Sequence, residues 1–141
     1  MATLKGLRIM FADDETYHMR GTIEALENAG AKVDVVTGGT KALEYLRKHE
    51  TKLPDLLILD IMMPGGPEIQ STNEGRTTGV EVFKWMQREN ITIPTVVSTV
   101  VTDPLILKIF REHKIPIVEK PYWFEDLVDQ IDKVLNEREK Q

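Results

Sequence analysis

The sequence predicts an α/β fold in which a doubly wound, five-stranded parallel sheet is covered by five helices. Short apolar runs alternate along the chain with longer segments whose apolar residues recur at helical spacing. The apolar runs are mostly continuous, as expected for parallel strands that are covered on both faces. Such units in succession favour right-handed crossovers and one layered domain over residues 1–141.

The candidate strands are rich in leucine or in β-branched residues, which pack well on a pleated sheet. Each is followed by a segment of helical period, so the pattern predicts parallel strands rather than hairpins. In chain order the expected strands are Leu7–Ala12, Lys32–Val36, Leu56–Leu59, Thr95–Ser98 and Ile117–Val118.

Apolar stripes predict one helix after each strand. In chain order they are Met19, Ile23 and Leu26; Leu43 and Leu46; Val82, Phe83 and Met86; Leu105, Ile106, Leu107, Ile109 and Phe110; and Phe124, Leu127, Val128, Ile131, Val134 and Leu135. Gly30 marks the end of the first helix, and Gly38–Gly39 precedes the second. Asp103–Pro104 supplies an N-cap and a first residue for the fourth helix. Apolar residues occur on more than one face of that fourth helix, so an exposed apolar surface that binds a partner is expected there.

Composition and charge exclude several classes of protein. The chain has no cysteine, which excludes a disulfide scaffold and cysteine metal sites. Its formal net charge is −5 and it has no basic stripe, so direct binding to nucleic acid is not expected. No apolar run is long enough for a signal peptide or a membrane helix. The sequence therefore predicts a cytoplasmic protein with no membrane partner.

Charged and hydroxyl residues follow four of the five predicted strands, where ligands bind to parallel sheets. They are Asp13 and Asp14 after the first strand, Asp60 after the third, Ser98 and Thr99 at the end of the fourth, and Lys120 after the fifth. Three carboxylates at one edge repel one another and raise at least one pKa. A hard divalent cation, Mg²⁺ or Mn²⁺, would relieve this repulsion, and the Lys120 ammonium would add a second positive charge.

Asp60 ends the apolar run LLILD, and a buried carboxylate is costly unless it is paired. It therefore either emerges at a rim or has a cationic partner. A position at the strand edge, beside a metal ion and Lys120, would satisfy both conditions.

Four motifs in this order resemble the receiver domain of two-component response regulators, from about Leu7 to Glu137. They are ADDE at residues 12–15, LILDIMMPG at 57–65, IPTVVST at 93–99 and VEKP at 118–121. The resemblance implies the flavodoxin-like, CheY-like strand order 2-1-3-4-5. It also implies a signalling module that accepts a phosphoryl group from a sensor histidine kinase or a phosphotransfer protein.

The resemblance implies a role for each residue of the site. Asp60 matches the phospho-acceptor. Asp13 and Asp14 match the acidic pair that holds Mg²⁺, with Asp14 as the direct ligand, and the backbone carbonyl of Met62 would complete the protein's ligands. The switch hydroxyl matches Thr99, and the lysine that pairs with the phosphoryl group matches Lys120.

The same resemblance implies that the chain is no enzyme with a separate substrate and catalyses only its own phosphorylation and dephosphorylation. It implies an output or homodimer contact through the face made by the fourth helix, the fifth strand and the fifth helix. Phosphorylation would bias the segment between the fourth strand and the fourth helix.

Three features depart from the family pattern. Val100 follows the switch threonine, where alanine or glycine is usual, and Ile117 replaces an aromatic residue three positions before the lysine. An extended connection at 65–78, GGPEIQSTNEGRTT, lies between the third strand and the third helix. It is expected to be a flexible surface loop, with a lid over the site or a partner contact as the alternatives.

Two other functions are considered. An aspartate-nucleophile phosphatase would need an acid two residues after Asp60, and Met62 cannot donate a proton. A receiver-like interaction domain that works without phosphorylation stays open because of Val100 and Ile117. Metal-dependent labelling with a small phosphoryl donor separates this reading from the phospho-accepting one.

Overall fold

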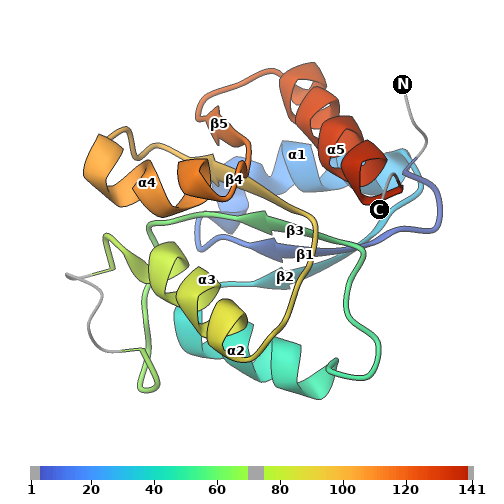
Figure 1. Cartoon of the computed structure of the whole chain (residues 1–141). Coiled ribbons are helices and arrows are strands. Elements are labelled where there is room, and N and C mark those ends of the chain that lie inside the picture. The colour runs from blue at the N-terminus through green and yellow to red at the C-terminus, as the bar shows by residue number, and fades with distance from the viewer. Residues whose placement is uncertain (1–3, 70–74, 140–141) are drawn as a thin grey trace.

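The computed structural model describes residues 4–69 and 75–139. Strands and helices alternate in this part of the chain as predicted (Figure 1). The elements are β1 Arg8–Ala12, α1 Thr16–Asn28, β2 Lys32–Val36, α2 Gly39–Lys48, β3 Leu56–Leu59, α3 Thr78–Arg88, β4 Thr95–Thr99, α4 Pro104–Glu112, β5 Ile117–Glu119 and α5 Phe124–Glu139.

The strands form one parallel sheet in the order β2-β1-β3-β4-β5, which confirms the predicted fold. Helices α1 and α5 cover one face, where Leu26 and Ile131 join the buried cluster. Helices α2, α3 and α4 cover the other face, through residues such as Leu46, Phe83 and Phe110. Strand β3 lies in the middle of the sheet, and every one of its residues is buried.

Strand boundaries differ from the prediction by one residue at three places. Strand β1 begins at Arg8 because the N–H of Leu7 bonds to the Leu4 carbonyl in a turn. Strands β4 and β5 extend to Thr99 and Glu119, which are paired with each other. Strand β2 is an edge strand with exposed and half-buried residues, so it is less covered than its apolar sequence suggested.

Helix α4 begins as its sequence predicts. The side chain of Asp103 accepts a hydrogen bond from the N–H of Leu105 at 2.9 Å, and Pro104 is the first helical residue. Since the first N–H groups of a helix have no partner within the helix, this cap fixes the start of α4.

The connection between β3 and α3 is packed where the structure describes it. The N–H groups of Gly39 and Thr40 donate to the carbonyls of Pro64 and Gly65, each at 2.7 Å. Gly38, the N-cap of α2, has no side chain that could accept these hydrogen bonds. Ile69 is only 8% exposed and belongs to the cluster under α2 and α3. The first part of the connection therefore caps α2.

The expected surface loop describes residues 65–69 only in part: residues 66–68 are exposed, but Ile69 is buried and the carbonyl of Gly65 accepts from the start of α2. An ion pair between Arg47 and Glu68 at 2.7 Å adds a contact at the surface. The polar residues of the same connection, which predict a mobile segment, lie outside the described residues; they are Ser71, Thr72, Asn73 and Glu74.

Gly79 lets α3 approach the end of β3. Its N–H donates to the Ile61 carbonyl at 2.9 Å. A Cβ atom at this position would overlap the Asp60 carbonyl oxygen and would lie 2.7 Å from the Ile61 Cα atom. Both are backbone atoms and cannot move aside as a flexible side chain could. Glycine at 79 is therefore required by packing next to Asp60.

Gly79→Ala is expected to lower the free energy of unfolding by about 1–3 kcal/mol, because overpacking outweighs the better helix propensity of alanine. Urea unfolding measures this change. The control is Gly21→Ala in α1, where an added Cβ would meet nothing within 4 Å. That control is expected to raise stability by up to about 1 kcal/mol. Equal stability of Gly79→Ala and wild type would contradict the packing analysis.

Ile69→Ala is expected to lower the free energy of unfolding by about 2 kcal/mol or more, since it removes buried apolar volume from the α2–α3 cluster. Glu68→Ala removes an exposed ion pair from the same segment and is expected to cost less than about 1 kcal/mol. If the two variants unfold at the same urea concentration as wild type, residues 65–69 do not pack in solution as they do here.

Candidate functional site

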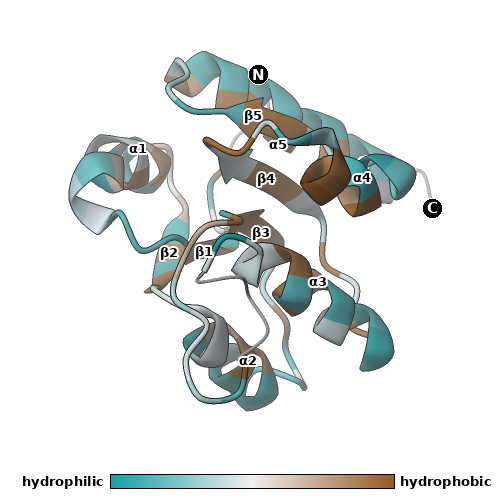
Figure 2. Ribbon diagram, turned by 90° about the vertical axis from the view of Figure 1, so that its left-hand side faces the viewer, coloured by the Kyte–Doolittle hydropathy of each residue, from teal (hydrophilic) through white to brown (hydrophobic). Residues whose placement is uncertain are grey.

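The site lies at the carboxyl ends of the strands, the edge of the sheet that faces the viewer in Figure 2. Backbone hydrogen bonds continue the pairing one residue past the strand ends. The N–H of Asp13 donates to the Val36 carbonyl at 3.0 Å, and the N–H of Asp60 donates to the Ala12 carbonyl at 2.8 Å. The two aspartates are therefore held by the sheet itself, next to each other on β1 and β3.

Asp60 is buried, with 3% of its surface exposed, and both of its carboxylate oxygens accept hydrogen bonds. The N–H groups of Ile61 and Met62 donate to Oδ1 at 2.7 and 3.3 Å. The ammonium of Lys120 donates to Oδ2 at 3.0 Å. Asp60 is therefore buried at the end of β3 and has the cationic partner that its position after an apolar run predicted.

Lys120 bridges Asp60 and Asp13. Its Nζ atom lies 2.7 Å from Oδ2 of Asp13, and the side chain of Asp13 is 2% exposed. The other oxygen of Asp13, Oδ1, accepts from the N–H of Glu15 at 2.8 Å. One ammonium therefore joins residues that follow β1, β3 and β5.

The charges in the site shift its pKa values. Burial raises the pKa of Asp60; the charge of Lys120 opposes this effect, the charge of Asp13 adds to it, and the pKa stays above its ordinary value. Burial alone would lower the pKa of Lys120, but its hydrogen bonds and its attraction to Asp13 and Asp60 raise it overall. Lys120 is therefore an ammonium at neutral pH. Desolvation, followed by the charges of Asp60 and Glu15, raises the pKa of Asp14.

The acidic residues fit a hard divalent cation. Asp13, Asp14 and Asp60 each offer a carboxylate oxygen, and these oxygens lie within 4.8 Å of one another. Asp14 is exposed, on the open side of the group, whereas Asp13 and Asp60 are buried. Three carboxylates with one ammonium leave excess negative charge, and an all-oxygen donor set suits Mg²⁺ or Mn²⁺.

The structure brings Thr99 into the same site. This residue is fully buried at the end of β4, and its Oγ1 atom accepts from the N–H of Val101 at 3.2 Å. Its hydroxyl also interacts with Asp60 and helps to lower the pKa of that carboxyl. Met62 lies at the rim with 40% of its surface exposed, and its backbone carbonyl as a metal ligand stays a prediction.

Two of the three departures from the family pattern concern β4 and β5: Val100 follows β4, and Ile117 begins β5. Val100 is 50% exposed directly after Thr99. Ile117 is half-buried in β5, opposite Val97. Neither residue adds a polar group to the site.

Sequence reasoning missed Tyr122, two residues after Lys120. Its hydroxyl lies 2.7 Å from the hydroxyl of Ser98 in β4. Burial raises the pKa of Tyr122, with a contribution from the nearby charges of Asp13 and Asp60, while the hydrogen bond to Ser98 and the charge of Lys120 lower it. The available signal was an aromatic residue soon after Lys120, together with a serine in an otherwise apolar strand.

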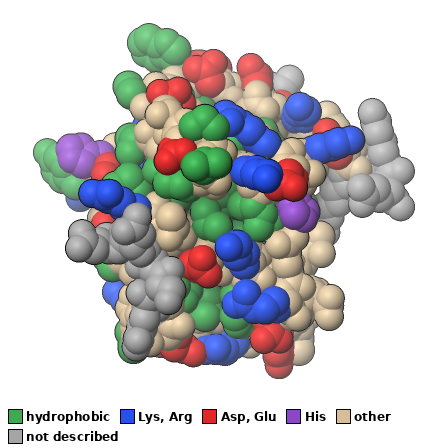
Figure 3. Space-filling view, turned by 60° about the vertical axis from the view of Figure 1, so that its left-hand side comes forward, with side chains coloured by type: hydrophobic (Ala, Val, Ile, Leu, Met, Phe, Trp, Pro, Cys, Tyr) green, Lys and Arg blue, Asp and Glu red, His purple; other side chains and the backbone are tan. Residues whose placement is uncertain are grey.

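Hydrophobic side chains also gather at the surface. The face in Figure 3 shows a group of them bordered by charged side chains. Leu105 at the start of α4 is 83% exposed, and Trp123 between β5 and α5 is 79% exposed. Within the described ranges, no helix is long and apolar enough to cross a membrane.

Comparison with known proteins identifies the domain. The family model described as response regulator receiver domain matches residues 9–132. An uncharacterized response regulatory protein of Vibrio cholerae is 26% identical over 134 residues, 95% of this chain and 51% of that protein. The alkaline phosphatase synthesis transcriptional regulatory protein PhoP of Bacillus subtilis is 29% identical over 92 residues, 65% of this chain and 32% of that protein. The chain thus spans about half or less of these relatives.

Solved structures agree in fold. A CheY-like response regulator receiver domain protein from Methanospirillum hungatei superposes with a TM-score of 0.73 at 23% identity, covering 95% of this chain and 97% of that chain. The BeF3-activated N-terminal receiver domain of Klebsiella pneumoniae RstA gives a TM-score of 0.70 at 21% identity, covering 91% and 97%. With the family match over most of its length, the chain belongs to the response regulator receiver domains of two-component signalling.

Proposed function

We propose that this receiver domain accepts one phosphoryl group on Asp60, with Mg²⁺ or Mn²⁺ bound, from a sensor histidine kinase or a phosphotransfer protein. One observation carries the proposal: the buried carboxylate of Asp60 lies 3.0 Å from the Lys120 ammonium, within the group formed with Asp13 and Asp14. An oxygen nucleophile, a fixed positive charge and a set of metal-binding oxygens are what phosphoryl transfer requires.

In the proposed reaction a carboxylate oxygen of Asp60 attacks the phosphorus of a phosphohistidine. A P–O bond forms and the P–N bond breaks, with its electron pair left on the imidazole nitrogen. The Ile61 N–H holds Oδ1 of Asp60 and orients the carboxylate. Lys120 stabilises negative charge on the transferring phosphoryl oxygens. A metal ion held by Asp13, Asp14 and Asp60 would neutralise further charge there.

Phosphorylation would then act on the segment between β4 and α4. The product has additional negative charge and new acceptor oxygens, to which hydroxyl and ammonium groups can donate. The Thr99 hydroxyl, now an acceptor for the Val101 N–H, can turn and donate to the phosphoryl group. That change would release the Val101 N–H at the start of the connection to α4, which couples the site to α4.

The proposed output surface is the α4–β5–α5 face. Leu105 in α4 and Trp123 between β5 and α5 are exposed and would provide apolar contact area for a partner or a second copy. In this proposal the chain turns over no separate substrate, because the phosphoryl group stays on its own Asp60 until that bond is hydrolysed. The alternative is a receiver that binds partners without phosphorylation, since Ile117 provides no aromatic switch.

The wild-type protein is expected to gain one phosphoryl group, measured by intact mass, when incubated with phosphoramidate and Mg²⁺. Asp60→Ala removes the nucleophile and is expected to remain unlabelled. Asp14→Ala removes a metal-binding oxygen and is expected to lose most labelling while it keeps the nucleophile.

Asp55→Ala provides the control for loss of an aspartate, since Asp55 precedes β3, at the opposite end of that strand from Asp60, where it accepts from the Arg8 N–H. It is expected to label as wild type does, provided that it is folded. Labelling of Asp60→Ala at the wild-type level would exclude Asp60 as the acceptor. A folded wild type that is never labelled, by small donors or by a kinase, would favour the phosphorylation-independent alternative.

Val100→Ala is expected to shorten the half-life of the phosphorylated protein about two- to tenfold. The half-exposed side chain of Val100 follows Thr99, and its removal would open the approach of water to the phosphoryl group. The loss of phosphoprotein mass with time measures the half-life. Leu105→Ala removes a more exposed apolar side chain further along the chain and should leave the half-life unchanged. An equal or longer half-life for Val100→Ala would refute this role.

A further inference from the structure

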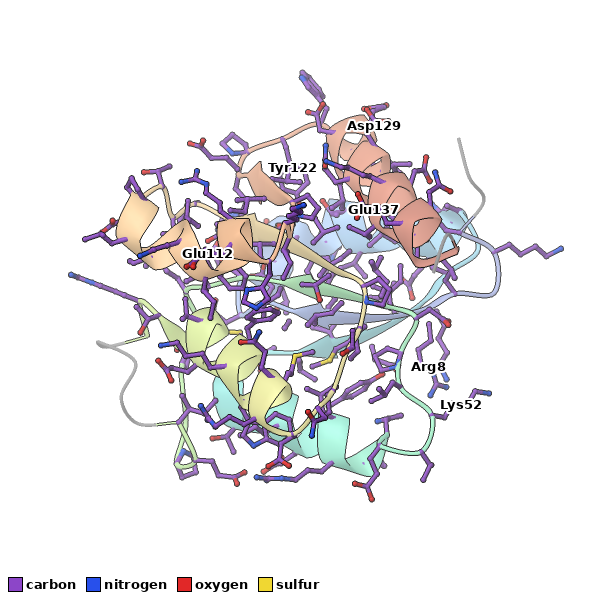
Figure 4. All side chains as sticks on the ribbon, viewed as in Figure 1. Arg8, Lys52, Glu112, Tyr122, Asp129 and Glu137 are labelled. Atoms are coloured by element: carbon purple, nitrogen blue, oxygen red, sulfur yellow. The ribbon has the colours of Figure 1, made fainter. Side chains whose placement is uncertain are left out.

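Two hydroxyl groups join β4 to the turn that follows β5. The hydroxyl of Tyr122 lies 2.7 Å from that of Ser98, and Ser98 is 1% exposed. Figure 4 shows Tyr122 where the chain passes from β5 toward α5. The Tyr122 ring packs against the cluster on the α1 and α5 face. A buried hydroxyl pair of this kind could serve only to satisfy two polar groups in the core.

The position of the pair in the chain indicates a further role. Ser98 directly precedes Thr99, and Tyr122 is two residues after Lys120. The N–H of Lys120 also donates to the Thr99 carbonyl at 2.8 Å. The backbone around Lys120 is therefore tied to β4 at two points, one before and one after its side chain.

The turn after Lys120 needs such a tie because its other residues are at the surface. Pro121 is exposed, and Trp123 is 79% exposed. The Trp123 N–H bonds to the side chain of Asp126, which is itself exposed on α5. Tyr122 is thus the residue of this turn that reaches into the protein.

The Lys120 side chain spans a long distance, so the direction in which it leaves the backbone determines where its ammonium lies. Strand β5 is separated from β3 by β4, and neighbouring strands lie about 4.8 Å apart, so the ammonium reaches roughly 10 Å across the sheet edge. A small rotation of the backbone at Lys120 moves the end of so long a side chain by much more than it moves the Cα atom. Asp60 and Asp13 can hold the ammonium only if it arrives between them.

We propose that Tyr122, through its hydrogen bond to Ser98, is a positioning residue that aims Lys120 at Asp60. The inference rests on the proposed function, because it concerns the lysine of that site. Tyr122 makes no contact with the phosphoryl group in this role and acts only through the backbone of Lys120.

The test compares phosphorylation rates over a range of phosphoramidate concentrations at saturating Mg²⁺. Tyr122→Phe and Ser98→Ala each remove the hydrogen bond and keep most of the side-chain volume. Each is expected to lower the limiting rate about five- to tenfold, with the half-saturating donor concentration little changed, because misplacement affects the transition state. The double variant should be no slower than either single variant, since both remove the same bond.

Two controls separate positioning from a loss of stability. Tyr45→Phe removes another partly buried tyrosine hydroxyl, which bonds to Asp34 at 2.6 Å on a different part of the sheet. It is expected to label at the wild-type rate. Ser98→Thr retains the hydroxyl and is expected to restore most of the rate lost in Ser98→Ala.

NMR of the metal-free protein gives a readout that does not depend on phosphorylation. A Lys120 side chain held in one rotamer gives two distinct Hε chemical shifts, and a mobile side chain averages them. The difference is expected to shrink in Tyr122→Phe but not in Tyr45→Phe.

The outcomes separate this inference from the proposed function. If wild type is labelled on Asp60 and Tyr122→Phe is labelled within twofold of the same rate, Tyr122 does not position Lys120. A slow Tyr122→Phe variant beside a normal Ser98→Ala variant would also overturn the inference, since the effect would not pass through Ser98. Failure of wild type to accept a phosphoryl group is instead a failure of the proposed function.

Discussion

The bridge that Lys120 makes between Asp13 and Asp60, at 2.7 and 3.0 Å, is the interaction on which the edge of the sheet depends. Both carboxylates are buried at the ends of neighbouring strands, where their repulsion has little water to screen it. The backbone N–H groups of Glu15 and Ile61 also donate hydrogen bonds to these carboxylates and so stabilise their negative charge. Removing the ammonium would leave two buried carboxylates without their cation. This would destabilise the fold more than replacing the whole ion pair with apolar side chains.

The single ammonium does not balance all the acidic groups of the site. Asp13, Asp14 and Asp60 carry three potential negative charges against one ammonium, and the pKa values of Asp14 and Asp60 are raised in consequence of burial and of this crowding. A divalent cation can supply the missing positive charge. In the proposed function, a bound metal ion would balance this excess of acidic oxygens and, with Lys120, would attract the phosphoryl oxygens.

Much of this arrangement could be predicted from the sequence, because it follows from strand ends. Once β1, β3, β4 and β5 are parallel, Asp60, Thr99 and Lys120 must meet at one edge, and the structure brings them together. Contacts that depend on side-chain direction could not be predicted in this way. The spacing of residues in the sequence does not predict the hydrogen bond between Tyr122 and Ser98. The turn after Lys120 determines the direction of the Tyr122 side chain.

The connection after β3 also makes contacts that its sequence does not predict. Its glycines and polar residues indicate freedom, and composition alone predicts a loop outside the core. The glycine at the N-cap of α2, however, leaves backbone N–H groups that need partners, and the carbonyls of Pro64 and Gly65 provide them. The unpaired N–H groups at the start of α2 thus find partners about 25 residues away in the chain, as the hydrogen bond from the Thr40 N–H to the Gly65 carbonyl shows.

The connection at 65–78 also supports the site. Asp60 is followed within a few residues by Pro64 and Gly65, which α2 holds, and Gly79 returns the chain against the backbone of Asp60 and Ile61. The backbone that carries Asp60 is therefore fixed from both sides by close contacts. An extension of this length is compatible with a precise site because its first and last described parts are packed, whatever the residues between them do.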